Sequence, residues 1–149
     1  MWFLRRLKAL GASSDQLLDC FQKQVLSVLW LGAPAWFCQT TQYEKKDINR
    51  VAKVGLKIIY GQAYSGFDEM LKISKIVKPT VQLARMTEKF ATKCSNHTKF
   101  SQWFVPSTID KVQTRTKKKK YHSIAARTDR FRESPIPHLT QILNDKSSK

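Results

Sequence analysis

Apolar residues recur along the first two thirds of the chain at the three- and four-residue spacing that places side chains on one face of an α-helix. The first stripe begins at Trp2 and continues to Leu10, with Arg5 and Arg6 on its opposite side. Gly11 follows directly, in the position where helices commonly end. We therefore expect a first amphipathic helix with a basic outer face.

A second and broader apolar stripe covers residues 17–29. Ser13 or Ser14 precedes it as a helix cap, and Pro34 stops or kinks the helix. The longest apolar run, 25–37, is interrupted by a glycine and a proline. It is too short to cross about 30 Å of hydrocarbon, so we interpret it as part of the core.

The strongest local signal is the capping box Thr41–Glu44, which opens a third helix that ends at Gly61. Arg50, Lys53 and Lys57 step by three and four along its outer face and therefore form one ridge. Such a ridge is suited to following a phosphate backbone. An ordinary solvated face explains it equally well.

Two further helices are predicted before the character of the chain changes. A short one starts within residues 65–68 and continues through Leu71. A longer one starts at Pro79, because proline has no amide hydrogen and the first helical residue needs none. After it, Phe100, Trp103 and Phe104 form an aromatic hook that we expect to fold back on the bundle.

The remaining residues form a basic tail. Residues 106–134 are polar and aperiodic and include the run Lys117–Lys120, so we expect disorder there, or order only on binding. Residues 134–143 are expected to dock as an extended piece followed by one or two helical turns. The predicted fold is all-α: a bundle of four or five helices over residues 1–104, and a flexible basic tail over 105–149.

The net charge of the chain narrows the range of functions that it can have. The 149 residues contain 27 Lys and Arg against 11 Asp and Glu, a formal net charge of +16. Residues 1–110 and residues 111–149 each contribute +8, so the tail is the denser electrostatic element. A polyanionic partner offsets the self-repulsion of such a chain, and nucleic acid is the commonest one. An acidic membrane surface and a solvated basic surface without a ligand are the alternatives.

The sequence contains little catalytic chemistry. It has no Asp-Asp pair to hold two magnesium ions, no Gly-rich phosphate loop and no H-E-x-x-H motif. His97, His122 and His138 stand in predicted loop or tail sequence without a neighbouring nucleophile. Three widely spaced cysteines argue against a zinc site and indicate reduced thiols in the cytosol or nucleus. We therefore predict neither an enzyme, nor a cofactor, nor a metal centre.

Several stretches, in order, resemble the region after the catalytic palm in reverse transcriptases of non-LTR retrotransposons, above all the jockey-like group. Residues 2–11 look like the first thumb helix, and residues 24–36 resemble a helix that runs into an A-P-x-W turn. Residues 47–61 resemble the next helix, and residues 85–93 the "R-R-x-x-L-x-x-K-F-A-x-K" helix. Residues 127–137 resemble the natural carboxyl terminus of these reading frames.

Two positions depart from that pattern. Gly55 lies inside a helix, at a cost of about 1 kcal/mol relative to alanine. Ala84 precedes Arg85 where the family commonly has an arginine pair. We interpret both as drift in a decayed copy.

The resemblance implies a thumb-like grip on a template–primer duplex, while the palm that carries the family's metal-binding aspartates has no counterpart here. RNA-containing duplexes are held through shape, phosphates and 2′-hydroxyls, so basic helices suffice. The expected partners are an RNA/DNA duplex or single strand, bound without sequence preference, and the missing palm and fingers, but no membrane. The candidate phosphate contacts are Arg5, Arg6, Arg50, Lys53, Lys57, Lys89, Lys117, Lys118, Lys119 and Lys120.

Three alternatives stay open at this point. The helical faces fit a protein–protein adaptor in which the charge is incidental. The basic, acid-free start is compatible with a mitochondrial presequence, beside the nuclear or cytoplasmic location that we expect. A pseudogene product that is never expressed or cannot fold alone is the third.

Overall fold

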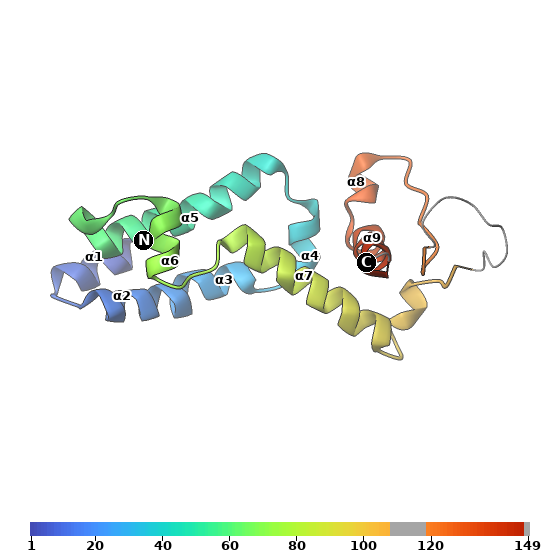
Figure 1. Ribbon diagram of the computed structural model, residues 1–149, viewed down its shortest axis with the longest axis horizontal. Coiled ribbons are helices and arrows are strands. Elements are labelled where there is room, and N and C mark those ends of the chain that lie inside the picture. The colour runs from blue at the N-terminus through green and yellow to red at the C-terminus, as the bar shows by residue number, and fades with distance from the viewer. Residues whose placement is uncertain (108–118, 148–149) are drawn as a thin grey trace. The chain divides into compact units, whose positions relative to one another are not determined.

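The computed structural model describes residues 1–107 and 119–147, and these are all-α, without a β-strand (Figure 1). The predicted fold class is therefore confirmed, although the described residues form more helices than the four or five expected. The chain divides into two compact units. The first consists of residues 1–33 and 40–83, and the second of residues 34–39 with the chain from Ala84 onward. Each is described separately.

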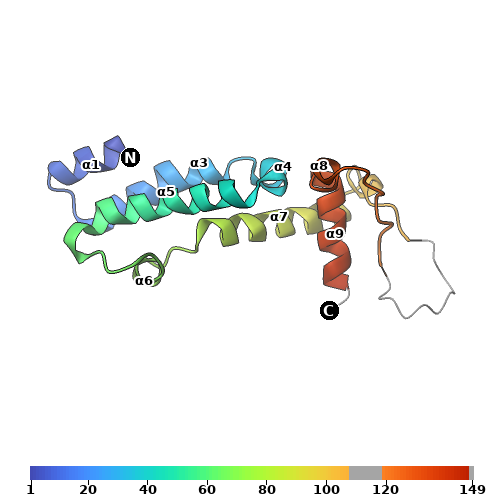
Figure 2. The same cartoon turned by 90° about the horizontal axis from the view of Figure 1, so that it is seen from above.

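The first unit is built around two antiparallel helical segments (Figure 2). One consists of α2 (Ser14–Cys20), a π-helical stretch and α3 (Ser27–Trp30), and the other is α5 (Gln42–Tyr60). The other elements of this unit are α1 (Trp2–Ala9), the short 3₁₀ turn Gly61–Ala63, α6 (Phe67–Ile73) and the beginning of α7 (Pro79–Asn96). The π-helical stretch, Phe21–Leu26, was not anticipated from the apolar stripe.

The core of the first unit joins α1, α2, α5 and α6. Leu4, Leu17, Phe21, Leu56 and Ile59 are almost fully buried and form its centre. These side chains come from the apolar stripes seen in the sequence, so the predicted core faces are confirmed in part. Other members of the same stripes are exposed: Trp2, Phe3, Leu10 and Val28. Each large apolar side chain of the core contributes about 1.5–3 kcal/mol when it is removed from water.

Gly55 has a packing role that the sequence did not reveal. It lies in the buried face of α5, and a Cβ atom at this position would lie only 2.5 Å from Cζ of Phe21. The glycine therefore lets the aromatic ring of Phe21 approach the backbone of α5. This close approach replaces the interpretation of Gly55 as drift, because a larger residue would collide with the core.

Several helix ends follow the predicted capping chemistry, but the helix expected to stop or kink at Pro34 ends at Trp30. At α5, Thr41 N–H donates to Oε2 of Glu44 at 2.7 Å, and Glu44 N–H donates to Oγ1 of Thr41 at 3.3 Å, so the predicted capping box is confirmed. The hydroxyl of Thr41 also donates to Oε2 of Glu44, at 2.8 Å, and the backbone and hydroxyl donors of Thr41 together lower the pKa of this carboxyl. At α2 the cap is Ser13, with Gln16 completing a second capping box. Gly61, with φ of 56°, ends α5 as expected.

A lysine attaches α1 to the far end of α5. Nζ of Lys8 donates to the carbonyl oxygens of Ile58 at 2.6 Å and Ile59 at 3.0 Å. The last carbonyls of a helix have no partner within the helix, and a cation near them also interacts favourably with the helix dipole. Lys8, on the basic face of α1, therefore has a structural role.

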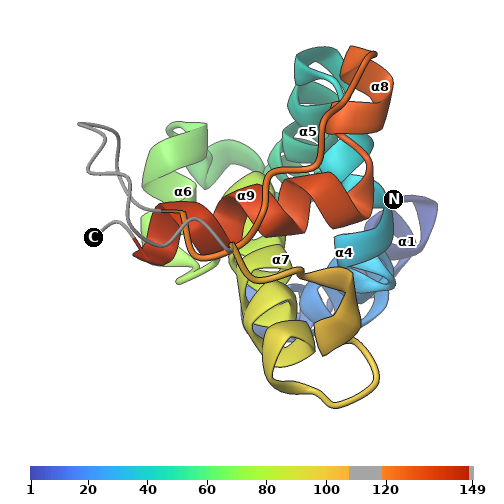
Figure 3. The same ribbon diagram turned by 90° about the vertical axis from the view of Figure 1, so that its right-hand side faces the viewer.

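The second unit packs the carboxyl-terminal part of α7 against α9 (Pro135–Ser147), as Figure 3 shows. Its core contains Ala91, Cys94, Phe104, Leu139 and Leu143. The smaller elements are α4 (Ala33–Trp36), the 3₁₀ turns Phe37–Gln39 and Ser101–Trp103, and α8 (Asp129–Arg132).

The tail differs in part from the sequence expectation. Helix α9 begins at Pro135 and has 13 residues, whereas an extended piece and one or two helical turns were expected. Both Pro135 and Pro137 fall in its first turn, where missing amide hydrogens cost nothing. Residues 119–128 have no helix, in line with their aperiodic sequence. Disorder was expected over residues 106–134, yet Asp129–Arg132 form α8 and Tyr121 is hydrogen-bonded to Asn144. Residues 108–118 of that stretch lie outside the described residues.

The side chain of Asn144, in α9, binds the backbone of Tyr121. This side chain accepts a hydrogen bond from Tyr121 N–H at 2.8 Å and donates to the carbonyl oxygen of Tyr121 at 3.1 Å. On its other side Tyr121 pairs with Pro106 in an isolated antiparallel bridge. These contacts hold Pro106, Tyr121 and Asn144 together.

Candidate nucleic-acid interface

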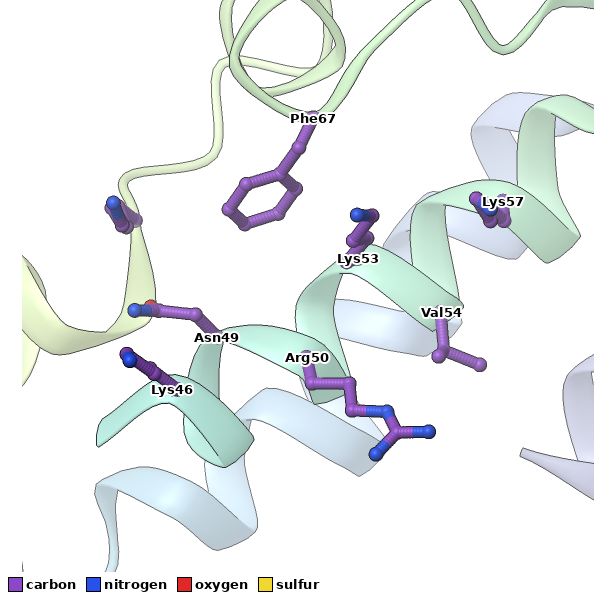
Figure 4. A pocket seen from close by; sticks show the side chains of 8 residues that line it. Lys46, Asn49, Arg50, Lys53, Val54, Lys57 and Phe67 are labelled. Carbon is purple, nitrogen blue, oxygen red and sulfur yellow. The ribbon is translucent and has the colours of Figure 1, made fainter. Parts of the chain in front are cut away.

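A cationic groove lies in the first unit, on the outer face of α5 (Figure 4). Its volume is about 560 Å³. It is lined by Lys46, Asn49, Arg50, Lys53, Val54, Lys57, Phe67 and Lys78. We call it the α5 groove.

Helical spacing explains four of its five positive charges. Lys46, Arg50, Lys53 and Lys57 follow one another at steps of four, three and four, which places them along one side of α5. The fifth, Lys78, stands immediately before α7. Helix α5 therefore supplies four cations along one side of the groove, and the segment between α6 and α7 supplies the fifth, Lys78.

A tertiary hydrogen bond fixes the approach of α7 to α5. The hydroxyl of Thr80 donates to Oδ1 of Asn49 at 3.2 Å, and the backbone N–H of Thr80 donates to the same oxygen at 3.4 Å. Asn49 itself lines the α5 groove. This pair of bonds therefore holds Lys78, two residues before Thr80, at the edge of the groove.

Phe67 provides an aromatic surface among these charges. It is the first residue of α6 and points from there towards α5, across from Lys53 (Figure 4). Phe67 is half-buried, since it also packs against the core. Further along α5, Nζ of Lys57 lies 5.5 Å from the centre of the Tyr64 ring, a cation–π distance that favours one orientation of the lysine.

No carboxylate is among the residues that line the α5 groove, so its five cations create a local positive potential. Like charges at four-residue spacing destabilise a helix by a few tenths of a kcal/mol per pair. A bound polyanion removes this repulsion and releases its own counterions. The groove thus has the positive charge that phosphate binding requires.

The sequence-predicted contacts do not all meet in one place. Arg50, Lys53 and Lys57 line the α5 groove, as their ridge predicted. Arg5 and Arg6 are exposed on α1 and do not line it. In the second unit Lys89, Lys119 and Lys120 are exposed, while Lys117 and Lys118 lie outside the described residues.

Lys119 lies in a second, smaller hollow with a different character. Its Nζ donates to Oγ of Ser123 at 2.9 Å, and the hollow also contains Asp145. Nζ of Lys120 lies 5.3 Å from the ring centre of Tyr121. This mixture of charges makes the hollow a weaker candidate for phosphate binding than the α5 groove.

Three groove residues that carry a charge or an aromatic ring were not among the predicted contacts: Lys46, Phe67 and Lys78. Lys46 lies one helical turn before Arg50, so the predicted ridge already contained the signal for it. Lys78 and Phe67 belong to segments that approach α5 only through tertiary packing. No periodicity along the chain could have placed these two beside the ridge.

Within residues 1–107 and 119–147, no cluster of three or more His, Cys, Asp and Glu side chains is suited to a metal ion. Burial raises the pKa of the Cys94 thiol, which makes this cysteine less reactive. No helix in the described part of the chain has the length and apolar content needed to cross a membrane.

The chain was compared with protein-family models, with curated proteins and with solved structures. None of the three comparisons found a match.

Proposed function

We propose that this protein binds nucleic acid through the sugar–phosphate backbone, without sequence preference, and that the α5 groove is the binding site. The observation that carries this proposal is the gathering of five cations, from two elements, around a groove without a carboxylate. Contacts to phosphates carry no sequence information, so binding through the backbone should not depend on the bound sequence.

We further propose that the chain is the thumb and post-thumb part of a non-LTR retrotransposon reverse transcriptase, acting as a non-catalytic fragment. The support is the ordered set of sequence resemblances together with the all-α fold. In this proposal the duplex of template and primer occupies the α5 groove. Nucleotide addition belongs to a palm and fingers that are encoded elsewhere.

A salt titration tests the binding proposal. We expect the full chain to bind a 20-base-pair RNA/DNA duplex in a filter assay, with similar affinities for duplexes of unrelated sequence. If the five groove cations each neutralise one phosphate, the slope of log K against log salt is about −4.5. A slope near zero, or no binding in dilute buffer, contradicts the proposal.

A separate observation tests the proposed origin. The genomic sequence upstream of this reading frame should encode the aspartate motif of a reverse transcriptase palm, in frame or after a frameshift. Intact upstream sequence of another kind rejects the retrotransposon origin but leaves the binding proposal in place. Metal-dependent nucleotide incorporation by the isolated chain contradicts the non-catalytic assignment.

A further inference from the structure

Three aromatic rings form an exposed row in the second unit, just beyond α7. The ring centres of His97 and Phe100 are 4.8 Å apart, and those of Phe100 and Trp103 are also 4.8 Å apart. Both pairs are tilted, with interplanar angles of 34° and 45°. We call these three residues the aromatic ladder.

The backbone explains why the rings line up. Residues 97–103 form successive tight turns, in which Phe100 N–H donates to the carbonyl oxygen of His97 and Trp103 N–H donates to that of Phe100, each at 3.0 Å. In turns of this 3₁₀ type, side chains three residues apart eclipse one another. The spacing of three between His97, Phe100 and Trp103 therefore stacks their rings along one side of the chain.

The ladder is not part of the core. Phe100 is 36% exposed and Trp103 is 37% exposed, whereas the next aromatic residue, Phe104, is 2% exposed and packs in the core. The expected aromatic hook thus divides into one buried anchor and two rings that face solvent. Nδ1 of His97 accepts a hydrogen bond from Lys99 N–H at 3.2 Å, which fixes the imidazole at the end of the row.

The chain on the amino-terminal side of these rings, and between them, carries positive charge alone. Lys89, Lys93 and Lys99 are exposed, and residues 89–103 contain no acidic residue. Exposed aromatic rings beside lysines match what unpaired nucleotides require: a flat surface for the base and a cation for the phosphate. A paired base cannot use such a surface, because both of its faces are already stacked in the duplex.

We infer that the aromatic ladder binds the bases of a single-stranded nucleic acid by stacking, with Lys93 and Lys99 contacting the adjacent phosphates. This inference deepens the proposed function with a second site, in the other compact unit, that recognises bases rather than backbone. Because every base has a π-face, the site tolerates any sequence. The α5 groove remains the site for the backbone of a duplex.

The test compares single-stranded and duplex binding by the full chain. The double variant Phe100→Ala/Trp103→Ala should bind a 15-nucleotide oligouridylate at least about tenfold more weakly than the wild type, since each lost stack weakens binding severalfold or more. Its affinity for a 20-base-pair duplex should stay within about twofold. The matched control is Phe131→Ala, which removes an exposed aromatic ring of the same unit from outside the ladder.

A second measurement covers the case in which the double variant fails to fold. A 2-aminopurine base in the single strand should lose fluorescence on binding to the wild type, because stacking quenches it. The variant Phe100→Tyr/Trp103→Phe retains the rings and should retain single-strand affinity. Absent quenching, unchanged single-strand affinity of the alanine variant, or an equal loss in Phe131→Ala overturns the inference. Unchanged affinity is also the result expected if the ladder binds a protein instead.

Discussion

Replacing Lys46, Lys53 and Lys78 by glutamine removes three of the five positive charges that line the α5 groove. All three side chains are exposed, and glutamine has nearly the helix propensity of lysine, so the fold should be retained. If the proposed binding site is correct, this variant keeps two phosphate contacts. The slope of log K against log salt should then fall from about −4.5 to about −1.8.

These slopes translate into a large difference in affinity. Between 50 and 200 mM salt, the wild type should lose affinity for a duplex by about 500-fold, and the variant by only about 12-fold. Fluorescence anisotropy with a labelled 20-base-pair duplex at four salt concentrations measures both slopes. Circular dichroism of the variant verifies that its helices remain.

The control variant removes the same net charge from outside the α5 groove. Lys72, Arg127 and Arg130 are exposed and do not line it, so their replacement by glutamine should leave the slope close to that of the wild type. An equal reduction of the slope by both triple variants would mean that the whole basic surface binds diffusely. An unchanged slope in the groove variant would refute the assignment of the site.

Three further predictions concern the fold. Gly55→Ala places a methyl group against Phe21 and should lower the free energy of unfolding by about 1–3 kcal/mol, despite the better helix propensity of alanine. Urea denaturation measures this change, and equal stability of the two proteins would contradict the packing role of Gly55. The lowered pKa of Glu44 means that its capping contribution is complete above pH 4.5, the ordinary value, and is lost as the pH falls through the lowered pKa. Urea denaturation should therefore show the wild type more stable than Glu44→Gln at neutral pH but not in acid, and a pH-independent difference would argue against this carboxylate. Lys8→Met removes both hydrogen bonds to the end of α5 and should destabilise the chain by about 1 kcal/mol in the same assay. An unchanged urea midpoint would show that these bonds contribute nothing to stability.

Local chemistry made the helix ends predictable. The capping box at Thr41, the cap expected at Ser13 or Ser14 and the stop at Gly61 each depend on residues within one turn of the boundary. The structure confirms the first and the last and places the second cap at Ser13. The ridge of Arg50, Lys53 and Lys57 was equally local, because it needs only the period of the helix.

The features that sequence reasoning missed depend on contacts between distant segments. Gly55 is explained by Phe21, 34 residues earlier in the chain. Phe67 and Lys78 join the α5 groove only because α6 and α7 pack beside α5. The exposure of Phe100 and Trp103 likewise depends on which aromatic side chain the second unit buries, and it buries Phe104.

The contacts around Tyr121 have a practical consequence for protein engineering. Two backbone hydrogen bonds join the described residues on either side of 108–118: Ser107 N–H donates to the carbonyl oxygen of Lys120 at 3.0 Å, and His122 N–H donates to that of Val105 at 2.8 Å. Asn144 adds two more hydrogen bonds at Tyr121. Doubling the length of a closed loop costs only about 0.6 kcal/mol. An epitope tag or a fluorescent peptide inserted between residues 107 and 120 should therefore leave the packing of α7 against α9 intact.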